Sequence, residues 1–437
     1  MTMSKPYALL LGAALGSLLA FNTLADDRQT RIINAAAAVD PQVIAWRRDL
    51  HQHPELSNRE VRTAKLVADH LRALGFDEVH TGIAHTGVVG ILKGGKPGGV
   101  VALRADMDAL PVEERNSLPF ASKVREEYNG QDVGVMHACG HDAHTAILMG
   151  VASVLAGMRE EIPGTVSFIF QPAEEGAPEG EEGGAKLMLA EGVLKTAANP
   201  SAIFGLHVWP GEAGEILYRP RGAMAASDEL KIVVTGKQTH GSSPWRGVDP
   251  ISVAAQIMTA LQAIPSRQLD ITKAPAVITI GSIHGGVRGN IIPDTVEMIG
   301  TIRNFDDGVR KELLMRLERT ATAIASAAGA EATVTIEPYS GVTWNDPDLT
   351  ARMLPSLQRA AEKVTEGPIV MGAEDFSWYQ QQIPGLFVML GVNLPGVSAE
   401  QAAPNHSPLF MVNETALKTG VRTLSMLALD YLQQQPR

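Results

Sequence analysis

The chain has 437 residues, with 37 Lys and Arg against 48 Asp and Glu, so its formal net charge at pH 7 is −11. This acidity argues against nucleic acid as a partner, because neutralising phosphates requires a basic surface. Hydrophobic residues make up 45% and charged residues 19%, which is a globular composition and excludes a disordered or collagen-like chain. Because one core rarely grows beyond about 300 residues, this length predicts more than one domain.

The first 25 residues differ from the rest of the chain. Lys5 precedes an apolar run from Tyr7 to Phe21, and Thr23-Leu24-Ala25 then precedes two aspartates. This pattern predicts a signal peptide over residues 1–25, cleaved after Ala25, and a periplasmic mature chain. The apolar run is shorter than the roughly 20 residues that span a bilayer, and no later stretch of the sequence is apolar for long enough to do so, so no stable membrane association is expected after cleavage. The alternative is an uncleaved N-terminal anchor.

The region up to residue 103 predicts two helices and then two strands. Asp40 and Pro41 are typical of an N-cap and first helical position, and residues 57–60 form a capping box for a second helix that ends at Gly75. The glycine-rich segment 94–99 predicts a hairpin-like turn between two apolar strands. We expect these strands at 88–92 and 100–103.

Strand and helix patterns then alternate. This alternation predicts βαβ units, and therefore an α/β fold with a mostly parallel sheet that helices cover on both faces. The expected elements are a helix at 144–158, a strand at 166–170, a helix at 185–194 and a strand at 202–206.

A different pattern begins near residue 222. Six elements follow in the order β-α-β-β-α-β, which is typical of a ferredoxin-like α+β domain. The first pattern returns after residue 338, so we predict a first catalytic-domain segment at 26–222, an inserted domain at 223–337 and a second catalytic-domain segment at 338–437. The six elements are expected at 229–235, 249–264, 276–283, 295–303, 307–328 and 332–337, and the last segment at helix 349–364, strand 386–390 and helix 413–433.

The densest group of reactive side chains lies at residues 136–144, just before a predicted helix. This segment holds three histidines and Cys139, the only cysteine of the chain. Imidazole and thiolate ligands suit a borderline-soft divalent metal. The alternative is a buried thiol flanked by surface histidines.

Further candidates follow the predicted strands. Glu174 and Glu175 come directly after one apolar strand, and His207 and Asp106 end two others. Ligands bind outside the carboxyl ends of strands in α/β sheets, so these groups are expected at one edge. One of two adjacent carboxylates can bind a metal while the other accepts a proton from water. His406 lies in a polar loop before the last helix, and the alternative for it is an ordinary loop histidine without a role in the site.

Eight motifs in order resemble the metallopeptidase M20 family, in its aminoacylase and carboxypeptidase-like amidohydrolase branch, which includes hippurate hydrolases and auxin-conjugate hydrolases. The resemblance covers essentially the whole mature chain. The motifs are Arg104–Pro111, Met136–His144, Phe170–Glu175, Gly205–His207, Thr239–Ser242, Asn290–Asp294, Gly372–Phe376 and Asn405–Ser407.

This resemblance implies a metallohydrolase domain that holds two divalent metal ions per subunit, with the inserted domain as a lid that mediates a homodimer or a higher homo-oligomer. Glu174 would be the general base, and Asp106 would orient a ligand histidine. Thiolate and imidazole ligands favour zinc, whereas carboxylates and imidazoles tolerate manganese or cobalt. The implied metal ligands are Cys139, His141, Glu175, His207 and His406.

The resemblance also implies roles for two lid residues. His240 would reach the active site of the partner subunit and stabilise the oxyanion, and Asn290 would hold the substrate carboxylate or carbonyl. The alternative for both is a capping or turn role.

The chain departs from the wider M20 pattern at one position. Most branches have a histidine where this sequence has Arg104, and they use an aspartate as the bridging ligand. Here Cys139 and His141 take that place, as in the chain's own branch, which leaves the metal identity open.

The predicted function is hydrolysis of the amide bond of N-acyl amino acids or small peptides by a metal-activated water. The alternatives are a dipeptidase, a peptidoglycan-precursor deacetylase, and a non-catalytic periplasmic protein that binds acyl-amino acids. A non-catalytic protein would be free to lose the base or a ligand, whereas here every implied position is filled.

Overall fold

The computed structural model describes the backbone of residues 7–435 and the side chains of residues 27–435. It contains two compact units, which we describe separately. The α/β unit comprises Met1–Tyr218, Ala351–Glu366 and Phe387–Arg437, and the α+β unit comprises Arg219–Thr350 and Gly367–Leu386. The α+β unit therefore includes residues on both sides of the segment 223–337.

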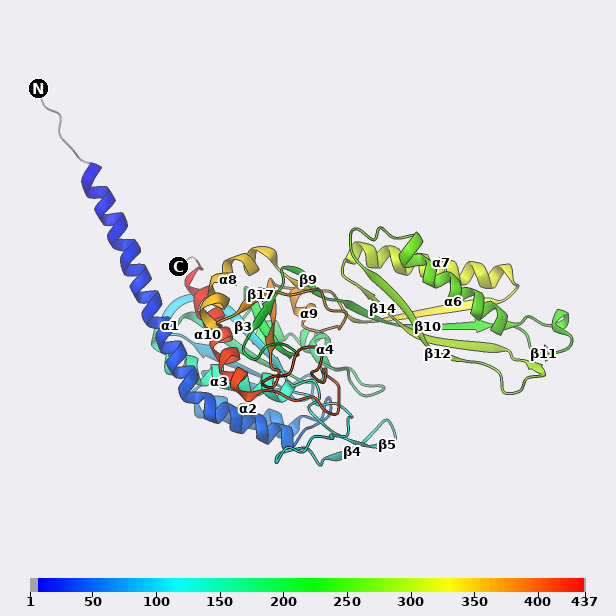
Figure 1. The fold of residues 1–437 in the computed structure, drawn as a ribbon, viewed down its shortest axis with the longest axis horizontal. Helices are drawn as coiled ribbons and strands as arrows, with labels where there is room; N and C mark the ends of the chain where they lie inside the picture. Colours follow the sequence, from blue (N-terminus) through cyan, green and yellow to red (C-terminus); the bar gives the residue numbers. More distant parts are fainter. Residues whose placement is uncertain (1–6, 436–437) are drawn as a thin grey trace, which may run out of the picture. The chain divides into compact units, whose positions relative to one another are not determined.

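An eight-stranded sheet forms the centre of the α/β unit in the part of the chain that the structure describes (Figure 1). The central strand β3 pairs in parallel with β6 and β7, while β1–β2, β2–β6 and β8–β18 are antiparallel. The prediction of an α/β fold with a large, mostly parallel sheet is confirmed. The strands lie in the order β1 (Glu78–Ile83), β2 (Gly87–Lys93), β6 (Pro163–Gln171), β3 (Lys96–Asp106), β7 (Ile203–Trp209), β18 (Gly385–Gly391), β8 (Ile216–Tyr218) and β17 (Val364–Glu366).

The hairpin-like turn predicted at residues 94–99 is wrong, because β6 lies between β2 and β3. The connection instead passes over the start of β6, where Gly94 N donates to Gly164 O at 2.8 Å. A Cβ on Gly98 would lie only 2.4 Å from Pro163 O, so this close crossing requires glycine. A turn can be predicted from neighbouring residues, whereas which strands pair in the sheet depends on residues far apart in the sequence.

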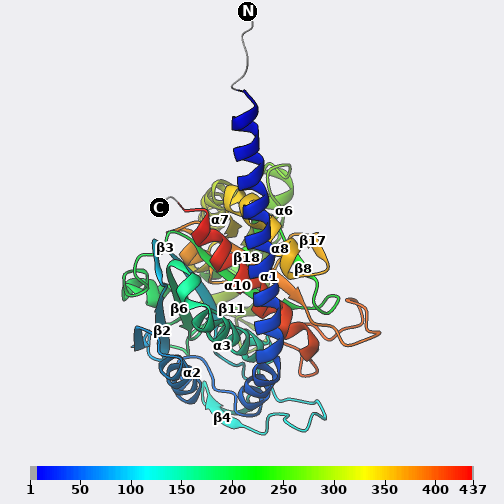
Figure 2. The same ribbon diagram turned by 90° about the vertical axis from the view of Figure 1, so that its left-hand side faces the viewer.

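Helix α1 (Tyr7–Gln52) is continuous, so the helix start predicted at Asp40 and Pro41 is wrong. Figure 2 shows α1 crossing in front of α3 (His141–Gly157) and α10 (Leu417–Gln433), and it packs against both. Packing of one face offsets the hydrogen bond that Pro41 cannot make. The buried residues on that face include Ile32, Ala36, Val43 and Leu50.

The predicted signal peptide lies partly outside the described residues. Residues 1–6 and the side chains up to residue 26 are not described, and residues 7–25 form the first part of α1. Among the described helices, none combines the length and the apolar character that a membrane crossing requires.

The second predicted helix is present as α2 (Val61–Ala73), but residues 57–60 do not form its capping box. The carboxylate of Glu55 accepts hydrogen bonds from Arg62 N and Thr63 N, each at 2.8 Å, and so satisfies the start of the helix. The Ser57 hydroxyl donates elsewhere, to Asp108 at 2.8 Å.

The helix predicted at 185–194 is divided into α4 (Gly184–Ala190) and α5 (Val193–Thr196). Gly192 between them has a φ of +82°, a left-handed conformation that ends a helix. The other elements of this unit are β4 (Arg125–Tyr128), β5 (Gln131–Gly134), α8 (Pro347–Ala360, which begins in the α+β unit), and short 3₁₀ turns at Arg159–Glu161 and Glu414–Ala416.

The α+β unit has a four-stranded antiparallel sheet in the order β12-β14-β10-β15, with α6 and α7 packed beside each other on one face (Figure 1). Its elements follow one another as β-α-β-β-α-β, and the sheet order is that of a ferredoxin-like unit. They are β10 (Ala226–Thr235), α6 (Pro250–Arg267), β12 (Ala276–His284), β14 (Thr295–Asn304), α7 (Asp307–Ala327) and β15 (Glu331–Ser340).

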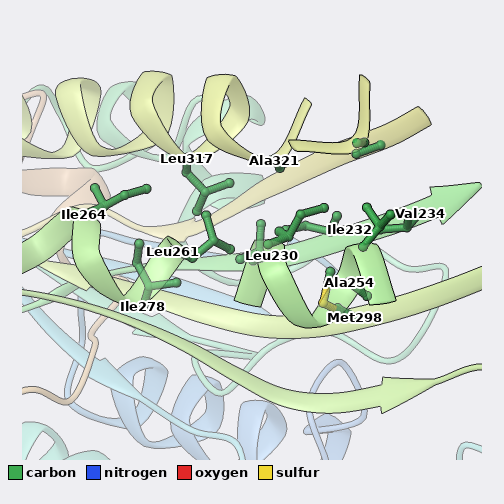
Figure 3. Close-up of a cluster of buried hydrophobic side chains, with 14 of the residues drawn as sticks. Leu230, Ile232, Val234, Ala254, Leu261, Ile264, Ile278, Met298, Leu317 and Ala321 are labelled. Carbon is green, nitrogen blue, oxygen red and sulfur yellow. The ribbon is translucent and has the colours of Figure 1, made fainter. Parts of the chain in front are cut away.

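The core of this unit lies between the sheet and the two helices. Leu230, Ile232 and Val234 alternate along β10, and their side chains meet those of α6 and α7, including Leu261 and Leu317 (Figure 3). This period of two is typical of a strand with one buried face. Smaller elements are β9 (Arg221–Met224), β11 (Thr239–His240), β13 (Ile291–Ile292), β16 (Thr343–Asn345), α9 (Ser377–Gln380) and a 3₁₀ turn at Pro244–Arg246.

Candidate metal centre

The first part of the site is the N-terminus of α3. Gly140 is the N-cap residue, with a φ of +95°, and it places Cys139 and His141 on either side of a sharp bend. A Cβ on Gly140 would lie 2.3 Å from Cγ2 of Val208. Only glycine therefore brings this bend against the end of β7.

His207 lies at that end of β7. Its Nδ1 lies 2.7 Å from Val208 O and donates to it, which leaves Nε2 facing the Cys139 Sγ at 3.3 Å. Burial, with His144 nearby, holds the pKa of His207 well below its usual value. The imidazole is therefore neutral, and its Nε2 lone pair is directed at the site.

The third part follows β6, where a tight turn carries Glu174 and Glu175. Ala173 has a φ of +51°, uncommon for a residue with a Cβ. The amides of Glu174 and Glu175 each donate to the buried carboxylate of Asp108 at 3.1 Å. These bonds fix the direction in which both glutamates leave the strand.

The loop around His406 completes the site. His406 has a φ of +70°, and its N–H donates to Ala138 O at 2.8 Å. The Asn405 amide donates to Cys139 O at 2.9 Å, which ties the loop to the start of α3. As a result, His406 Nε2 lies 3.1 Å from Glu175 Oε1, and this contact raises the pKa of the histidine.

All five predicted ligands and the predicted base meet in the α/β unit. Their ligand atoms form three overlapping groups, and within each group all the atoms lie within 4.8 Å of one another. The groups are Cys139, His141 and His207; Cys139, Glu175 and His406; and His141, Glu174 and Glu175.

These residues fit a divalent cation. Within the described part of the chain, the buried Nε2 of His141 has no hydrogen-bond partner, although such atoms are normally satisfied. Burial, with Glu175 and Glu174 alongside, raises the pKa of the Cys139 thiol well above its usual value. A thiol placed between carboxylates and imidazole nitrogens matches the mixed ligands of zinc sites, while the carboxylates also suit manganese.

Asp106 hydrogen-bonds His144, which is not among the predicted ligands, and not one of the predicted ligand histidines. Its carboxylate bonds to His144 Nδ1 at 2.5 Å and to the guanidinium of Arg104 at 2.5 Å, whereas His141 Nδ1 lies 3.8 Å away. His144 Nε2 accepts the N–H of Val208 at 2.8 Å, so both of its ring nitrogens are used. Arg104, Asp106 and His144 therefore form a chain of hydrogen bonds that ends at the backbone of Val208 in β7.

Sequence reasoning missed Asp108, which takes the position predicted for Asp106. Its carboxylate lies 3.2 Å from His141 Nδ1. Burial disfavours its charge, but His141 and the amide of Glu175 outweigh burial and lower the pKa of Asp108. The available signal was its place two residues beyond Asp106, directly after the same strand.

His141 is held between two carboxylates. Burial disfavours the imidazolium, but Asp106 and Asp108 outweigh burial and raise the pKa of His141 to about 10. The same negative charge that favours the imidazolium would also attract a bound cation.

His240 and Asn290 lie close together in the α+β unit: His240 is the last residue of β11, and Asn290 immediately precedes β13, which pairs with β11. Gly241 N donates to Asn290 O at 2.8 Å, and the Ser242 hydroxyl lies 2.8 Å from His240 Nδ1. His240 is exposed.

Comparison with known proteins gives consistent matches. The model of peptidase family M20/M25/M40 matches residues 102–430. Thermostable carboxypeptidase 2 of Saccharolobus solfataricus is 41% identical over 408 residues, covering 93% of this chain and 99% of that protein. N-acetylcysteine deacetylase of Bacillus subtilis is 38% identical over 400 residues, covering 91% and 99%.

A solved structure agrees with these matches. A Bacillus subtilis protein, described as a dinuclear metal binding peptidase from the M20 family, superimposes with a TM-score of 0.76 at 37% identity, covering 91% of this chain and 99% of that one. The family match covers most of the chain, and the motifs and fold agree with it. The chain therefore belongs to peptidase family M20/M25/M40, in its amidohydrolase branch, and is a hydrolase.

Proposed function

We propose that this protein hydrolyses the amide bond of N-acyl amino acids or small peptides, using two divalent metal ions per subunit. The observation that carries this proposal is the position of Glu174 beside the group of predicted ligands, with its Oε2 3.8 Å from His141 Nε2. The names of a carboxypeptidase and an N-acetylcysteine deacetylase among the relatives support cleavage of an amide bond next to an amino acid.

Bound metal ions would supply Lewis acidity, which can lower the pKa of a coordinated water from 15.7 to about 7 and polarise the scissile carbonyl. Cys139, His141, Glu175, His207 and His406 would hold the ions. Glu174 would accept the proton of the attacking water and deliver it to the leaving amine. Its backbone N–H is bonded to Asp108, so the turn that carries this side chain is held in place before substrate arrives.

The test is a chelation and reconstitution experiment on the purified protein. Metal-free protein is assayed before and after addition of Zn²⁺, Mn²⁺ or Co²⁺, against a panel of N-acyl amino acids and dipeptides. We expect activity only with metal and faster turnover of the acyl amino acids. A metal-loaded protein that binds these compounds without cleaving them would instead be a binding protein, and faster turnover of dipeptides would make it a dipeptidase.

We further propose that the α+β unit acts as a lid that joins two copies of the chain. Exposed apolar side chains at its surface support this, notably Trp245 at 77% and Val287 at 97% exposure, with Ile283 on the edge strand β12. Edge strands and apolar patches are typical of self-association. Light scattering should give a dimer or a larger oligomer, and a strict monomer would contradict the proposal.

In such a dimer His240 would act in the active site of the partner subunit, and Asn290 would bind the substrate. Removing one oxyanion donor typically costs about 10²–10³ in kcat, so His240→Ala should lose activity of this order. Mixing His240→Ala with Glu174→Gln should restore part of the activity, because mixed dimers regain one intact site. Asn290→Ala should mainly raise KM. If mixing recovers nothing, His240 does not act across the dimer.

We also propose that the mature protein is periplasmic and begins at Asp26. Arg28 and Arg31 lie just beyond the predicted cleavage site. Arg28 contacts Asp430 at 3.5 Å and Arg31 contacts Glu161 at 2.5 Å, so the mature chain would keep both ion pairs. N-terminal sequencing of the protein after export should find Asp26 first. An intact N-terminus in the membrane fraction would show a retained anchor.

A further inference from the structure

One buried carboxylate, that of Asp108, bonds both to His141 and to the turn that carries Glu174 and Glu175. It is 1% exposed. Its Oδ1 lies 3.2 Å from His141 Nδ1 and accepts the N–H of Glu174 at 3.1 Å. Its Oδ2 accepts the N–H of Glu175 at 3.1 Å and the hydroxyl of Ser57 at 2.8 Å.

These four bonds join segments that are far apart in the sequence. His141 is on the first turn of α3, whereas Glu174 and Glu175 follow β6. Because both oxygens of a single carboxylate are used, the imidazole and the two glutamate amides cannot move independently. The bond to Nδ1 also leaves Nε2, which has no hydrogen-bond partner within the described residues, directed toward Glu174 and Glu175.

A second buried carboxyl group provides a matched comparison. Glu60 is 0% exposed and accepts the N–H of Ala173 at 2.9 Å, immediately before the two N–H groups that Asp108 accepts. Its other partners are Asn58 N and the hydroxyl of Thr86. Glu60 therefore holds the same turn as Asp108 but makes no hydrogen bond to His141.

We propose that Asp108 is the positioning residue of the metal centre, which fixes His141 for metal binding through Nε2 and holds the base Glu174 in register with it. This inference rests on the proposed metal-dependent function. It assigns to Asp108 the role that was predicted for Asp106, whose carboxylate is hydrogen-bonded to His144 and Arg104. Partners of metal-bound histidines typically change metal affinity or activity 10–100-fold when they are replaced.

The test is titration of the metal-free protein with Co²⁺, followed by absorption, for wild type, Asp108→Asn, Glu60→Gln and Asp106→Asn. In Asp108→Asn an N–H₂ group replaces one of the two carboxylate oxygens. This group cannot accept a hydrogen bond, so the N–H of Glu174, the N–H of Glu175 or His141 loses its acceptor. We expect at least a tenfold loss of Co²⁺ affinity and an altered cobalt spectrum. Glu60→Gln should bind Co²⁺ within about threefold of wild type, because its partners do not include His141.

Two outcomes would overturn the proposal while leaving the function intact: equal Co²⁺ affinities for Asp108→Asn and Glu60→Gln, or a larger loss in Asp106→Asn than in Asp108→Asn. A wild-type protein that takes up no Co²⁺ would refute the proposed function itself. Circular dichroism controls for folding.

A second measurement needs no variant. The ¹⁵N shifts of His141 in the zinc-loaded wild-type protein should show zinc on Nε2 and a proton on Nδ1. Zinc on Nδ1 would displace Asp108 from this role and overturn the proposal.

Discussion

His406 Nε2 lies 3.1 Å from Glu175 Oε1, although the two residues belong to different segments of the α/β unit. The chain between them includes the whole α+β unit. His406 reaches Glu175 because its loop is bonded to the backbone of Ala138 and Cys139. The candidate metal centre is therefore assembled by contacts between distant segments, and its rigidity depends on them.

The two adjacent glutamates should respond differently to the same substitution. Glu174→Gln removes the base, so it should keep both metal ions and lose about 10²–10⁴ in kcat. Glu175→Gln weakens a ligand, so it should lose metal as well as activity. Metal content and kcat, measured together on both variants, check this. A Glu174→Gln enzyme with wild-type kcat would refute the assignment of the base.

Gly140 should tolerate alanine much less well than Gly192 does. Both have a left-handed φ, which costs an alanine about 1–2 kcal/mol. At Gly192 nothing lies within 4 Å of the new Cβ, whereas at Gly140 it would meet Val208 at 2.3 Å. Gly140→Ala should therefore lose a further 1–3 kcal/mol of unfolding free energy and bind metal more weakly. Urea denaturation with metal titration tests this, and equal effects of both variants would contradict it.

Glu60 should make the stability of the protein depend on pH. Burial, together with the nearby carboxylate of Asp108, raises the pKa of Glu60 from 4.5 to about 8. Between these values the folded protein keeps a proton that the unfolded chain has released, so the free energy of unfolding falls as pH rises. Glu60→Gln removes this dependence.

The measurement is urea denaturation of metal-free wild type and Glu60→Gln at pH 5 and pH 8. Relative to the variant, the wild type should lose a few kcal/mol across this window. If the two proteins change in parallel, Glu60 titrates normally in the folded protein.

His144 and His207 provide a test of which imidazoles bind metal. Both ring nitrogens of His144 already have partners, Asp106 and Val208 N, whereas His207 Nε2 faces the Cys139 Sγ. His207→Ala should lose metal, while His144→Gln should lower the melting temperature and retain its metal once folded. If His144→Gln loses metal and His207→Ala does not, His144 is the metal ligand and His207 the structural histidine.

Most of the fold could be predicted from the sequence, because its signals are local. The alternation along β10 and the apolar runs of β6 and β7 predict strands without knowledge of their neighbours. The misplaced features depend on distant residues. Pro41 lies inside α1 because α1 packs against α3 and α10, and the segment 94–99 is not a hairpin because β6 separates β2 from β3.

That the ligands would lie together could be predicted, because their motifs and the ends of the predicted strands indicate a common edge of the sheet. The sequence could not distinguish Asp106 from Asp108. Asp106 is the last residue of β3 and Asp108 lies two residues beyond it, and only the arrangement of His141 and His144 on α3 decides which carboxylate faces which ring. The roles of His240 and Asn290 remain predictions that depend on the resemblance to the M20 family.

The most direct test of the metal centre is anomalous diffraction from crystals grown with Zn²⁺. Two peaks should lie among the Sγ of Cys139, the imidazoles of His141, His207 and His406, and the carboxylates of Glu174 and Glu175. The absence of peaks there, or a peak bound instead between Asp106 and His144, would contradict the account.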